Sequence, residues 1–277
     1  MAYIKERTPA FSGEAEVIGK TLLGRDIILY HIGAGAKTLL IGGVHAREYV
    51  TCGLLERLIA REAKDGINVD YLPVLNPDGV MLCKYGIESV TDEAVRKRLI
   101  EINGGSRDFR LWKANASGVD VNVNFDADWG DGKYNVTEPA PANYIGKYAC
   151  SEPETIAVTE LLKKNDYALV VCYHSLGEEV YWGYESNFRH YKEAKRYADY
   201  LGYALKRSEN STGGIKDYYA LNFGGLGLTV EIGKDSYGHP CGEEKCEEIY
   251  LRHRGSLALL DALGEEIYGR IHVGGVT

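Results

Sequence analysis

The chain has 277 residues, of which 45% are hydrophobic and 26% are charged, an ordinary composition for a globular protein. Its length fits one large α/β domain or two small ones, and it is sufficient to bury a core without disulfides or a structural metal. The formal net charge of −8 argues against a nucleic-acid or anionic-membrane partner, and no stretch is apolar enough to span a bilayer.

The N-terminal residues 1–13 lack the apolar core of an export signal, and we expect them to form an extended segment. The sequence therefore predicts a cytoplasmic protein. Reduced thiols are compatible with that compartment, and the cysteines are scattered along the chain at Cys52, Cys83, Cys150, Cys172, Cys241 and Cys246. Cys241 and Cys246 lie close together, but no second Cys or His pair accompanies them, so a zinc site there is not favoured.

The first half of the chain begins with strand patterns. Residues 16–18 and 27–32 flank a polar segment and predict a hairpin, and residues 37–44 (KTLLIGGV) predict a buried strand. Apolar residues then recur at helical spacing over 48–61. Residues 70–75 predict a further strand, and the sequence Asn76-Pro77-Asp78-Gly79 predicts the turn that ends it.

The second half continues the alternation of helices and strands. The sequence Ser151-Glu152-Pro153-Glu154 predicts a helix start with a capping box. Two short apolar runs, residues 167–173 and 225–230, predict strands, and residues 243–263 predict a closing helix. Such alternation predicts an α/β fold, a single domain over residues 1–277 with a central mixed, twisted sheet flanked by helices.

Three of the predicted strands run into residues that bind or activate metals. The first is followed by His45 and Glu48, the second by His174 and the third by Glu231. In open α/β sheets, ligands bind outside the carboxyl ends of the strands. If the three strands are parallel neighbours, these four side chains meet at one edge of the sheet.

Two imidazoles and one carboxylate form a known catalytic zinc set that leaves a position for water. A further carboxylate, here Glu231, can serve as the general base. Taken singly, each residue has an ordinary explanation, since a His-x-x-Glu pair often starts a helix; a Glu in an apolar run, however, is costly to bury unless it is paired or functional. The remaining histidines have no such context and are expected to be structural: His31, His190, His239, His253 and His272.

With these residues in place, the sequence resembles the zinc carboxypeptidase family. The resemblance rests on the order and spacing of GGVHAREY (42–49), LNPDG (75–79), WKANASGVDVNVNFDADWG (112–130), SEPET (151–155), YHS (173–175), GGIKDYY (213–219) and TVEIG (229–233). It implies a single α/β domain with a mixed sheet, one Zn²⁺ ion and a metal-activated water.

The resemblance also implies roles for individual residues. His45, Glu48 and His174 match the zinc ligands, and Glu231 matches the catalytic glutamate. Arg47 and Asn122 fall on substrate-binding positions. Lys113 falls where the digestive carboxypeptidases place an arginine that stabilises the oxyanion; a lysine keeps the charge but loses the bidentate geometry.

Departures from the family pattern bear on the substrate. Val123 stands where the digestive enzymes have the arginine that binds a C-terminal carboxylate. The position of their substrate-capping tyrosine is occupied by Glu209, and Tyr203, Tyr218 or Tyr219 could substitute for it. Lys216 falls where the family sets specificity for the side chain after the scissile bond; a cation there suits an acidic side chain.

The WKAN and GGIKD segments and IGKTLLGRDI (18–27) resemble the bacterial γ-D-glutamyl-diaminopimelate peptidases of this family. The sequence thus predicts a zinc peptidase that cuts γ-D-glutamyl-meso-diaminopimelate bonds in cell-wall peptides, with a peptide or muropeptide as its partner. One alternative is a metallocarboxypeptidase that releases acidic C-terminal residues. Another, from a different class, is an inactive binding protein that keeps the fold.

Overall fold

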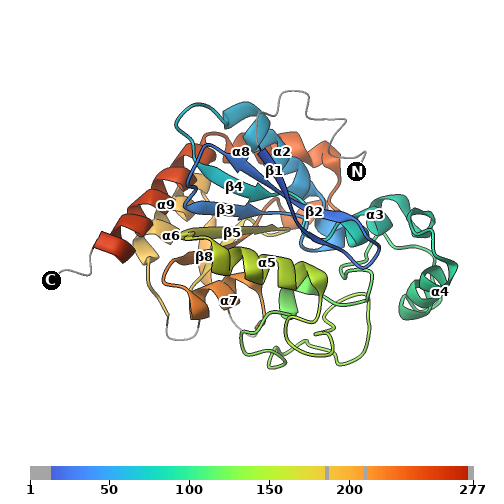
Figure 1. The fold of residues 1–277 in the computed structure, drawn as a ribbon. Coiled ribbons are helices and arrows are strands. Elements are labelled where there is room, and N and C mark those ends of the chain that lie inside the picture. The colour runs from blue at the N-terminus through green and yellow to red at the C-terminus, as the bar shows by residue number, and fades with distance from the viewer. Residues whose placement is uncertain (1–13, 185–186, 209–210, 274–277) are drawn as a thin grey trace.

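The computed structural model describes residues 14–184, 187–208 and 211–273, so the predicted N-terminal segment 1–13 and Glu209 lie outside the described residues. Within them, one eight-stranded sheet has the order β1-β2-β4-β3-β5-β8-β6-β7 (Figure 1). Its strands are β1 (Glu14–Lys20), β2 (Asp26–Ile32), β3 (Thr38–Ile41), β4 (Val69–Leu72), β5 (Leu169–His174), β6 (Glu179–Trp182), β7 (Ala204–Arg207) and β8 (Leu226–Glu231).

Helices cover both faces of this sheet (Figure 1). The α-helices are α2 (Val50–Glu62), α3 (Pro77–Tyr85), α4 (Glu93–Ile102), α5 (Pro153–Lys164), α6 (Tyr191–Leu201), α7 (Ile215–Asn222), α8 (Cys246–His253) and α9 (Ser256–Val273). Short 3₁₀ turns complete the set: η1 (Ala46–Glu48), η2 (Ile87–Ser89), η3 (Val121–Val123), η4 (Asp235–Tyr237) and η5 (Glu243–Lys245).

The sheet is mixed, with a parallel centre. Strands β4, β3, β5 and β8 run parallel to one another, whereas β1, β2 and β6 pair antiparallel with their neighbours β2, β4 and β8. The three strands that were predicted to end in functional residues, β3, β5 and β8, are adjacent and parallel. Their carboxyl ends therefore meet at one edge, which fulfils the condition set by the sequence argument.

Successive side chains of the central strands point to opposite faces of the sheet and pack into two separate hydrophobic layers. Leu40 and Val171 pack with α2, α6, α8 and α9 on one face, and Leu39 and Val170 pack with α5 and α7 on the other. A smaller cluster around Trp112 unites α3 and α4 beyond the sheet edge. Because both faces are covered, the central strands are mostly apolar, as expected for parallel strands. The predicted single-domain α/β fold with a mixed, helix-flanked sheet is confirmed.

Most predicted elements are present, with shifted ends. The hairpin, the strands near 37–44, 70–75, 167–173 and 225–230, and the helix near 48–61 correspond to β1–β2, β3, β4, β5, β8 and α2. The turn predicted at 76–79 is wrong, because these residues begin α3. Asn76 caps that helix by accepting a hydrogen bond from the Gly79 amide at 2.9 Å, and Pro77 occupies its first turn.

Two helix predictions also need correction. Helix α5 begins where expected, but its N-cap is Glu152 and no side chain caps it, so the predicted capping box is absent. The closing helix predicted over 243–263 is divided into η5, α8 and α9. The break falls at Gly255, which has a φ of 83°, a left-handed conformation that ends a helix.

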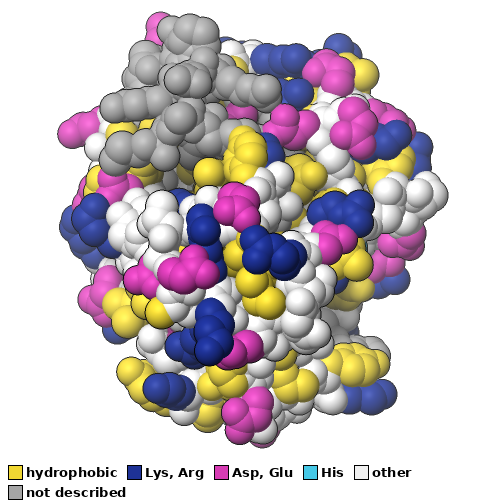
Figure 2. Space-filling model, turned by 90° about the vertical axis from the view of Figure 1, so that its right-hand side faces the viewer, with side chains coloured by type: hydrophobic (Ala, Val, Ile, Leu, Met, Phe, Trp, Pro, Cys, Tyr) yellow, Lys and Arg dark blue, Asp and Glu magenta, His cyan; other side chains and the backbone are white. Residues whose placement is uncertain are grey.

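Figure 2 shows the face on the right of Figure 1, where basic and acidic side chains are interspersed outside the grey segment. Within residues 14–184, 187–208 and 211–273, no helix combines the length and apolar character needed to cross a bilayer.

Candidate metal centre and active site

The turn between β3 and α2 places His45 and Glu48. Gly43 makes this turn possible, since its φ is 59° and a Cβ there would lie 2.9 Å from the Cys52 Sγ atom. The Thr51 hydroxyl closes the turn by accepting a hydrogen bond from the Gly43 amide at 2.9 Å and donating one to the Glu48 carbonyl at 2.7 Å. Both side chains are thereby held at the carboxyl end of β3.

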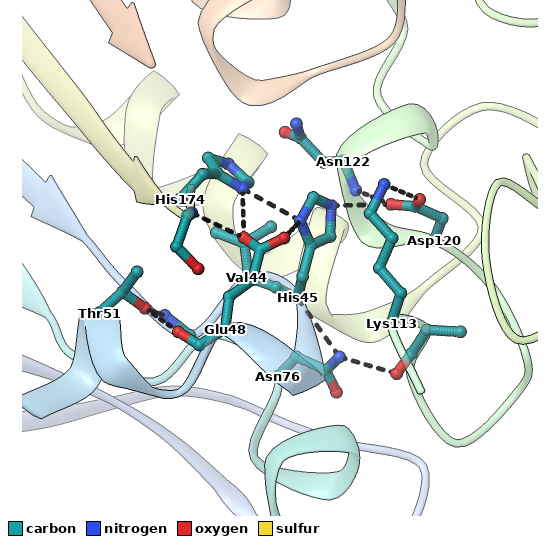
Figure 3. A network of polar contacts seen from close by, with 12 residues as sticks. Val44, His45, Glu48, Thr51, Asn76, Lys113, Asp120, Asn122 and His174 are labelled. Carbon is teal, nitrogen blue, oxygen red and sulfur yellow. Dashed lines mark hydrogen bonds and ion pairs between the residues drawn. The ribbon is translucent and has the colours of Figure 1, made fainter. Parts of the chain in front are cut away.

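His174, the last residue of β5, meets that pair (Figure 3). Its Nδ1 lies 3.1 Å from the His45 Nδ1 and 3.1 Å from the Glu48 Oε2, while the Glu48 Oε1 lies 2.9 Å from the His45 Nδ1. All three side chains are buried. Burial alone would raise the pKa of Glu48, but His45 and His174 hold that pKa well below its usual range, so the carboxylate is ionised.

This cluster has the chemistry of a metal site. One donor atom from each of the three residues lies within 4.8 Å of the others, and no other such group occurs among the residues that the structure describes. Donors bound tetrahedrally at zinc distances are about 3.3 Å apart, close to the separations seen here. Two imidazoles and a carboxylate therefore fit one Zn²⁺ ion.

Asp120 is a member of this site that the sequence argument did not single out. It is fully buried, and its Oδ1 lies 3.1 Å from the His45 Nε2 (Figure 3). Its Oδ2 forms an ion pair of 2.8 Å with Lys113. Burial would raise the pKa of Asp120, but the charges of Lys113 and His45 hold it well below its usual value. A carboxylate in this position fixes the tautomer of the ligand histidine that it contacts, here His45. His174 has no such partner among the described residues, since its Nε2 is buried without a hydrogen bond.

We predict that Asp120→Ala lowers the affinity for Zn²⁺ about 10-fold to 100-fold, because His45 loses the acceptor that orients its ring. A competition titration against a chromogenic chelator measures this change. The matched variant Asp120→Asn keeps an acceptor oxygen and should retain more of the affinity. Equal affinities of Asp120→Ala and the unchanged protein would remove Asp120 from this role.

Glu231 ends β8 and is the register partner of His174 in the parallel β5–β8 pair. Its side chain is partly exposed. Although the residue keeps some contact with solvent, the surrounding protein desolvates its carboxyl group and raises the pKa of Glu231 to about 8; the His174 charge opposes this rise, and the nearby Glu48 carboxylate adds to it. The carboxyl group is thus close to the donor cluster, without being one of its members.

The remaining predicted site residues differ in what they contact. Lys113 is paired with Asp120. Asn122 lies in η3, whose N-cap is Asp120. The Asn122 Oδ1 accepts a hydrogen bond from the Ile215 amide at 3.2 Å, which joins the GGIKD segment to the site. Arg47, in η1, forms no ion pair with a described residue, and its Nε is buried without a hydrogen-bond partner.

Lys216 is only 3% exposed. Its ammonium group forms an ion pair with Asp217 and donates a hydrogen bond of 2.8 Å to the Gly183 carbonyl. Val123 is buried against Gly213, whose Cβ position would lie 2.8 Å from the Val123 carbonyl oxygen. Lys216 therefore has no free charge to offer a substrate, and Val123 carries no charge at all.

The tyrosines considered as substitutes for the missing capping residue are all buried. The Tyr219 hydroxyl donates to the Tyr167 carbonyl at 2.6 Å, and the Tyr203 hydroxyl lies 3.2 Å from the His253 Nε2. Tyr218 packs 5.8 Å from the ring centre of Phe125. Each is already part of the core packing.

Buried polar contacts anchor the segment that carries Lys113 and Asp120. The Asn115 amide group donates to the Glu152 Oε2 at 2.8 Å and to the Glu154 Oε2 at 3.1 Å. The Oε1 of Glu154 is buried without a hydrogen-bond partner. Burial raises the pKa of Glu154 to about 7, and the Glu152 charge adds to the rise, so this carboxyl group holds its proton in mildly acidic solution.

This arrangement predicts a pH-dependent stability. The pKa of Glu154 is about 7 in the folded chain and 4.5 in the unfolded chain, so its contribution is complete below pH 4.5 and is lost as the pH rises to 7. At 1.36 kcal/mol per pKa unit, the loss is at most about 3 kcal/mol. Glu154→Gln should raise the free energy of unfolding at pH 8 by up to that amount and leave it unchanged at pH 4.

Urea unfolding at both pH values measures this effect. The matched control is Glu160→Gln, an exposed carboxylate on the same helix α5, which should change the free energy of unfolding little at either pH. Parallel pH profiles for Glu154→Gln and the unchanged protein would contradict the prediction.

Comparison with known families agrees with this geometry. The family model described as zinc carboxypeptidase matches residues 1–250. The chain belongs to the zinc carboxypeptidase family. This is a family of metallopeptidases, and the match covers every residue of the donor cluster as well as Asp120 and Glu231.

Among curated relatives of the family, the chain is 30% identical over 247 residues to gamma-D-glutamyl-L-diamino acid endopeptidase 1 from Lysinibacillus sphaericus. That alignment covers 82% of this chain but only 62% of the length of the relative.

Two solved structures share the fold. Bovine thrombin-activatable fibrinolysis inhibitor, in complex with tick carboxypeptidase inhibitor, has a TM-score of 0.72 at 18% identity, covering 95% of this chain and 92% of that one. Murein-tripeptide amidase MpaA from Escherichia coli O157 has a TM-score of 0.63 at 23% identity, covering 94% and 95%.

Proposed function

We propose that this member of the zinc carboxypeptidase family hydrolyses γ-D-glutamyl amide bonds to meso-diaminopimelate in cell-wall peptides. The observation that carries the peptidase assignment is the buried His45–Glu48–His174 cluster with Glu231 on the neighbouring strand. The choice of bond is supported by the name of the relative from Lysinibacillus sphaericus and by the sequence segments quoted above. A diamino acid next to a γ-D-glutamyl residue is the linkage that this name describes.

In the proposed mechanism, His45, Glu48 and His174 hold one Zn²⁺ ion. An ion bound there would supply polarisation of the scissile carbonyl and a lower pKa of water. Glu231 accepts the proton of the attacking water and delivers it to the leaving nitrogen as the C–N bond breaks. A nearby cation lowers the pKa of a carboxyl group, so the bound ion would bring Glu231 toward the ionised form that a base requires.

Cationic and amide side chains complete the proposed site. The ammonium group of Lys113 would stabilise the negative charge that develops on the carbonyl oxygen, and the guanidinium group of Arg47 would bind the substrate. Asn122 would bind the substrate backbone. Asp120 keeps Lys113 beside His45, since it contacts both side chains.

The identity of Val123 supports a bond other than an ordinary C-terminal peptide bond. The Val123 side chain is apolar and 8% exposed, so it cannot bind a carboxylate. The digestive carboxypeptidases have an arginine at this position, which binds the C-terminal carboxylate of the substrate. The alternative of a carboxypeptidase for acidic C-terminal residues would need a cation at Val123 or a free one at Lys216. The Lys216 charge is already paired with Asp217.

The decisive experiment is product analysis with the zinc-loaded protein. The tripeptide L-Ala-γ-D-Glu-meso-diaminopimelate is compared with peptides that end in Glu or Asp. We expect release of diaminopimelate from the tripeptide and a much lower kcat/KM for the acidic peptides. Faster cleavage of the acidic peptides would replace the proposed function with the alternative one.

Lys216 remains a predicted substrate contact, and its own test separates that role from a structural one. Removing one partner of a buried ion pair costs about 3–5 kcal/mol. We therefore predict that Lys216→Met strongly destabilises the fold, whereas the matched double variant with Asp217→Asn recovers at least half of the lost free energy of unfolding. If Lys216 binds the substrate, KM for the tripeptide rises in the stable double variant; an unchanged KM would exclude that role.

A further inference from the structure

The loop after β8 lies against the start of α2, beside the turn that carries Arg47 and Glu48. Lys84 links the two regions, since it forms an ion pair with Glu243 and its Nζ lies 5.1 Å from the ring centre of Tyr49. The Sγ of Cys246 lies 3.7 Å from the Val50 carbonyl oxygen. These contacts fix the segment between β8 and α8 next to the proposed active site.

His239 belongs to this loop, and it differs from the histidines that are structural. His253 lies beside a tyrosine hydroxyl, and His190 beside the Gly224 carbonyl at 2.9 Å. The Nδ1 of His239 is buried without a partner, as is the Nδ1 of His253, but His239 makes no hydrogen bond to a described residue at its other ring nitrogen either. Burial lowers the pKa of His239; the Glu48 charge opposes this, and Arg47, His45 and Lys113 add to it. The expectation that His239 is structural therefore stays a prediction, and no described hydrogen bond shows such a role.

Arg47 is the second group near this loop that lacks a partner. Its Nε is buried and makes no hydrogen bond, and no described carboxylate pairs with its charge. Lys113 and Lys216, by comparison, are each paired with an aspartate. A buried donor without an acceptor is costly, so these groups are suited to a ligand that brings its own acceptors.

The segments that carry these two donors are in contact, since Cys246, at the end of the loop after β8, reaches the Val50 carbonyl just after the turn of Arg47. The loop of His239 packs through Ile232 and Cys241 into the core layer of α2 and α9. The segments of Val123 and Lys216 pack through Val121 and Ile215 into the opposite layer, with α5 and α7. In the digestive carboxypeptidases that this chain resembles, an arginine at the position of Val123 binds the C-terminal residue, which is the part of the substrate that leaves. Arg47 and His239 would then face the acyl part.

We propose that Arg47 and His239 together bind the free α-carboxylate of a γ-linked D-glutamyl residue on the acyl side of the scissile bond. This inference rests on the proposed function. A γ linkage consumes the side-chain carboxyl group and leaves the α-carboxylate two methylene groups and one α-carbon away from the scissile carbonyl. A guanidinium donates two parallel hydrogen bonds to a carboxylate, and a neutral imidazole donates one more.

The test compares two substrates with the same γ bond. One is L-Ala-γ-D-Glu-meso-diaminopimelate, and the other carries an α-amide in place of the α-carboxylate. We expect the unchanged protein to prefer the carboxylate by at least about 10-fold in kcat/KM, because one lost charged contact is worth about that factor. His239→Phe should lower this preference, because one of the three proposed hydrogen bonds is lost, whereas His239→Asn, which keeps a donor, should lower it less.

A binding measurement gives a readout that needs no catalysis. The product L-Ala-D-Glu should bind the unchanged protein more tightly than its α-amide does. Thermal unfolding of His239→Phe verifies that the variant is folded. If it is not folded, binding of L-Ala-D-Glu and of its α-amide to the unchanged protein still tests whether the α-carboxylate is recognised. The variant His239→Asn then tests whether His239 takes part in that recognition.

Each result has a distinct meaning. Equal kcat/KM for the two γ-linked substrates overturns this inference and leaves the proposed function intact. A preference that is as large in His239→Phe as in the unchanged protein overturns the assignment of His239. Cleavage of neither γ-linked substrate, together with cleavage of peptides that end in Glu or Asp, overturns the proposed function and this inference with it.

Discussion

Replacement of Glu231 by Gln is expected to reduce kcat roughly 10²-fold to 10⁴-fold, because the amide cannot accept the proton of the attacking water. The side chain keeps its size, and Glu231 is not among the three clustered donors, so zinc content and thermal stability should stay unchanged. Steady-state kinetics on the tripeptide and metal analysis of the same sample measure both properties.

The control for this variant is Glu179→Gln. Glu179 is the register partner of Glu231 on the other side, in the antiparallel β6–β8 pair, and it has the same side chain. Its carboxylate is paired with Lys206, and it has no proposed part in the reaction. A loss of activity in Glu179→Gln as large as that in Glu231→Gln would indicate that local charge, and not proton transfer, accounts for the effect.

Loss of a metal ligand is the second large effect that we predict. Structural zinc sites with four ligands bind with about 10–16 kcal/mol, or roughly 3 kcal/mol per ligand. His174→Ala should therefore weaken zinc binding on the order of 100-fold to 1,000-fold and remove activity at ordinary metal concentrations. Metal analysis after dialysis and kinetics with added zinc measure these changes.

The fold itself should survive this substitution, because the two hydrophobic layers of the sheet do not depend on the donor cluster. His190→Gln is the matched control, since His190 contacts the Gly224 carbonyl and is not part of the donor cluster. Retention of stoichiometric zinc by His174→Ala would contradict the assignment of His174 as a ligand.

Much of the architecture followed from apolar periodicity. The strands β3, β5 and β8 are continuous apolar runs, which is typical of parallel strands covered on both faces, and each run leads directly to a polar residue of the site. The convergence of His45, Glu48 and His174 could therefore be predicted before any side-chain position was known. Their roles in catalysis remain proposals that the variants above test.

Other features depend on partners that a sequence does not reveal. Asp120 stands in a polar, irregular segment, and only its contacts with His45 and Lys113 identify its part in the site. Its place two residues before Asn122, a predicted site residue, was the one available signal. Lys216 shows the converse, because its charge suggested a substrate contact while the fold pairs it with the adjacent Asp217.

The local sequence also led to a wrong prediction where one motif is compatible with two backbone conformations. The sequence Asn76-Pro77-Asp78-Gly79 suits both a turn and the first residues of a helix, and tertiary contacts decide between them. The Asn76 amide group donates to the carbonyls of Val44 and Ala114 at 3.3 and 3.1 Å, which fixes the start of α3 against the β3 loop. Such contacts join segments that are distant in sequence.

The register of β5 against β8 has a consequence for how this protein can change. Six consecutive residue pairs, from Leu169 with Leu226 to His174 with Glu231, fix the ends of the two strands relative to each other. An insertion of one residue in either strand would turn its terminal side chain to the opposite face of the sheet. During divergence, these strands can exchange one apolar residue for another but cannot change in length, so new substrate preferences must arise in the loops that follow them.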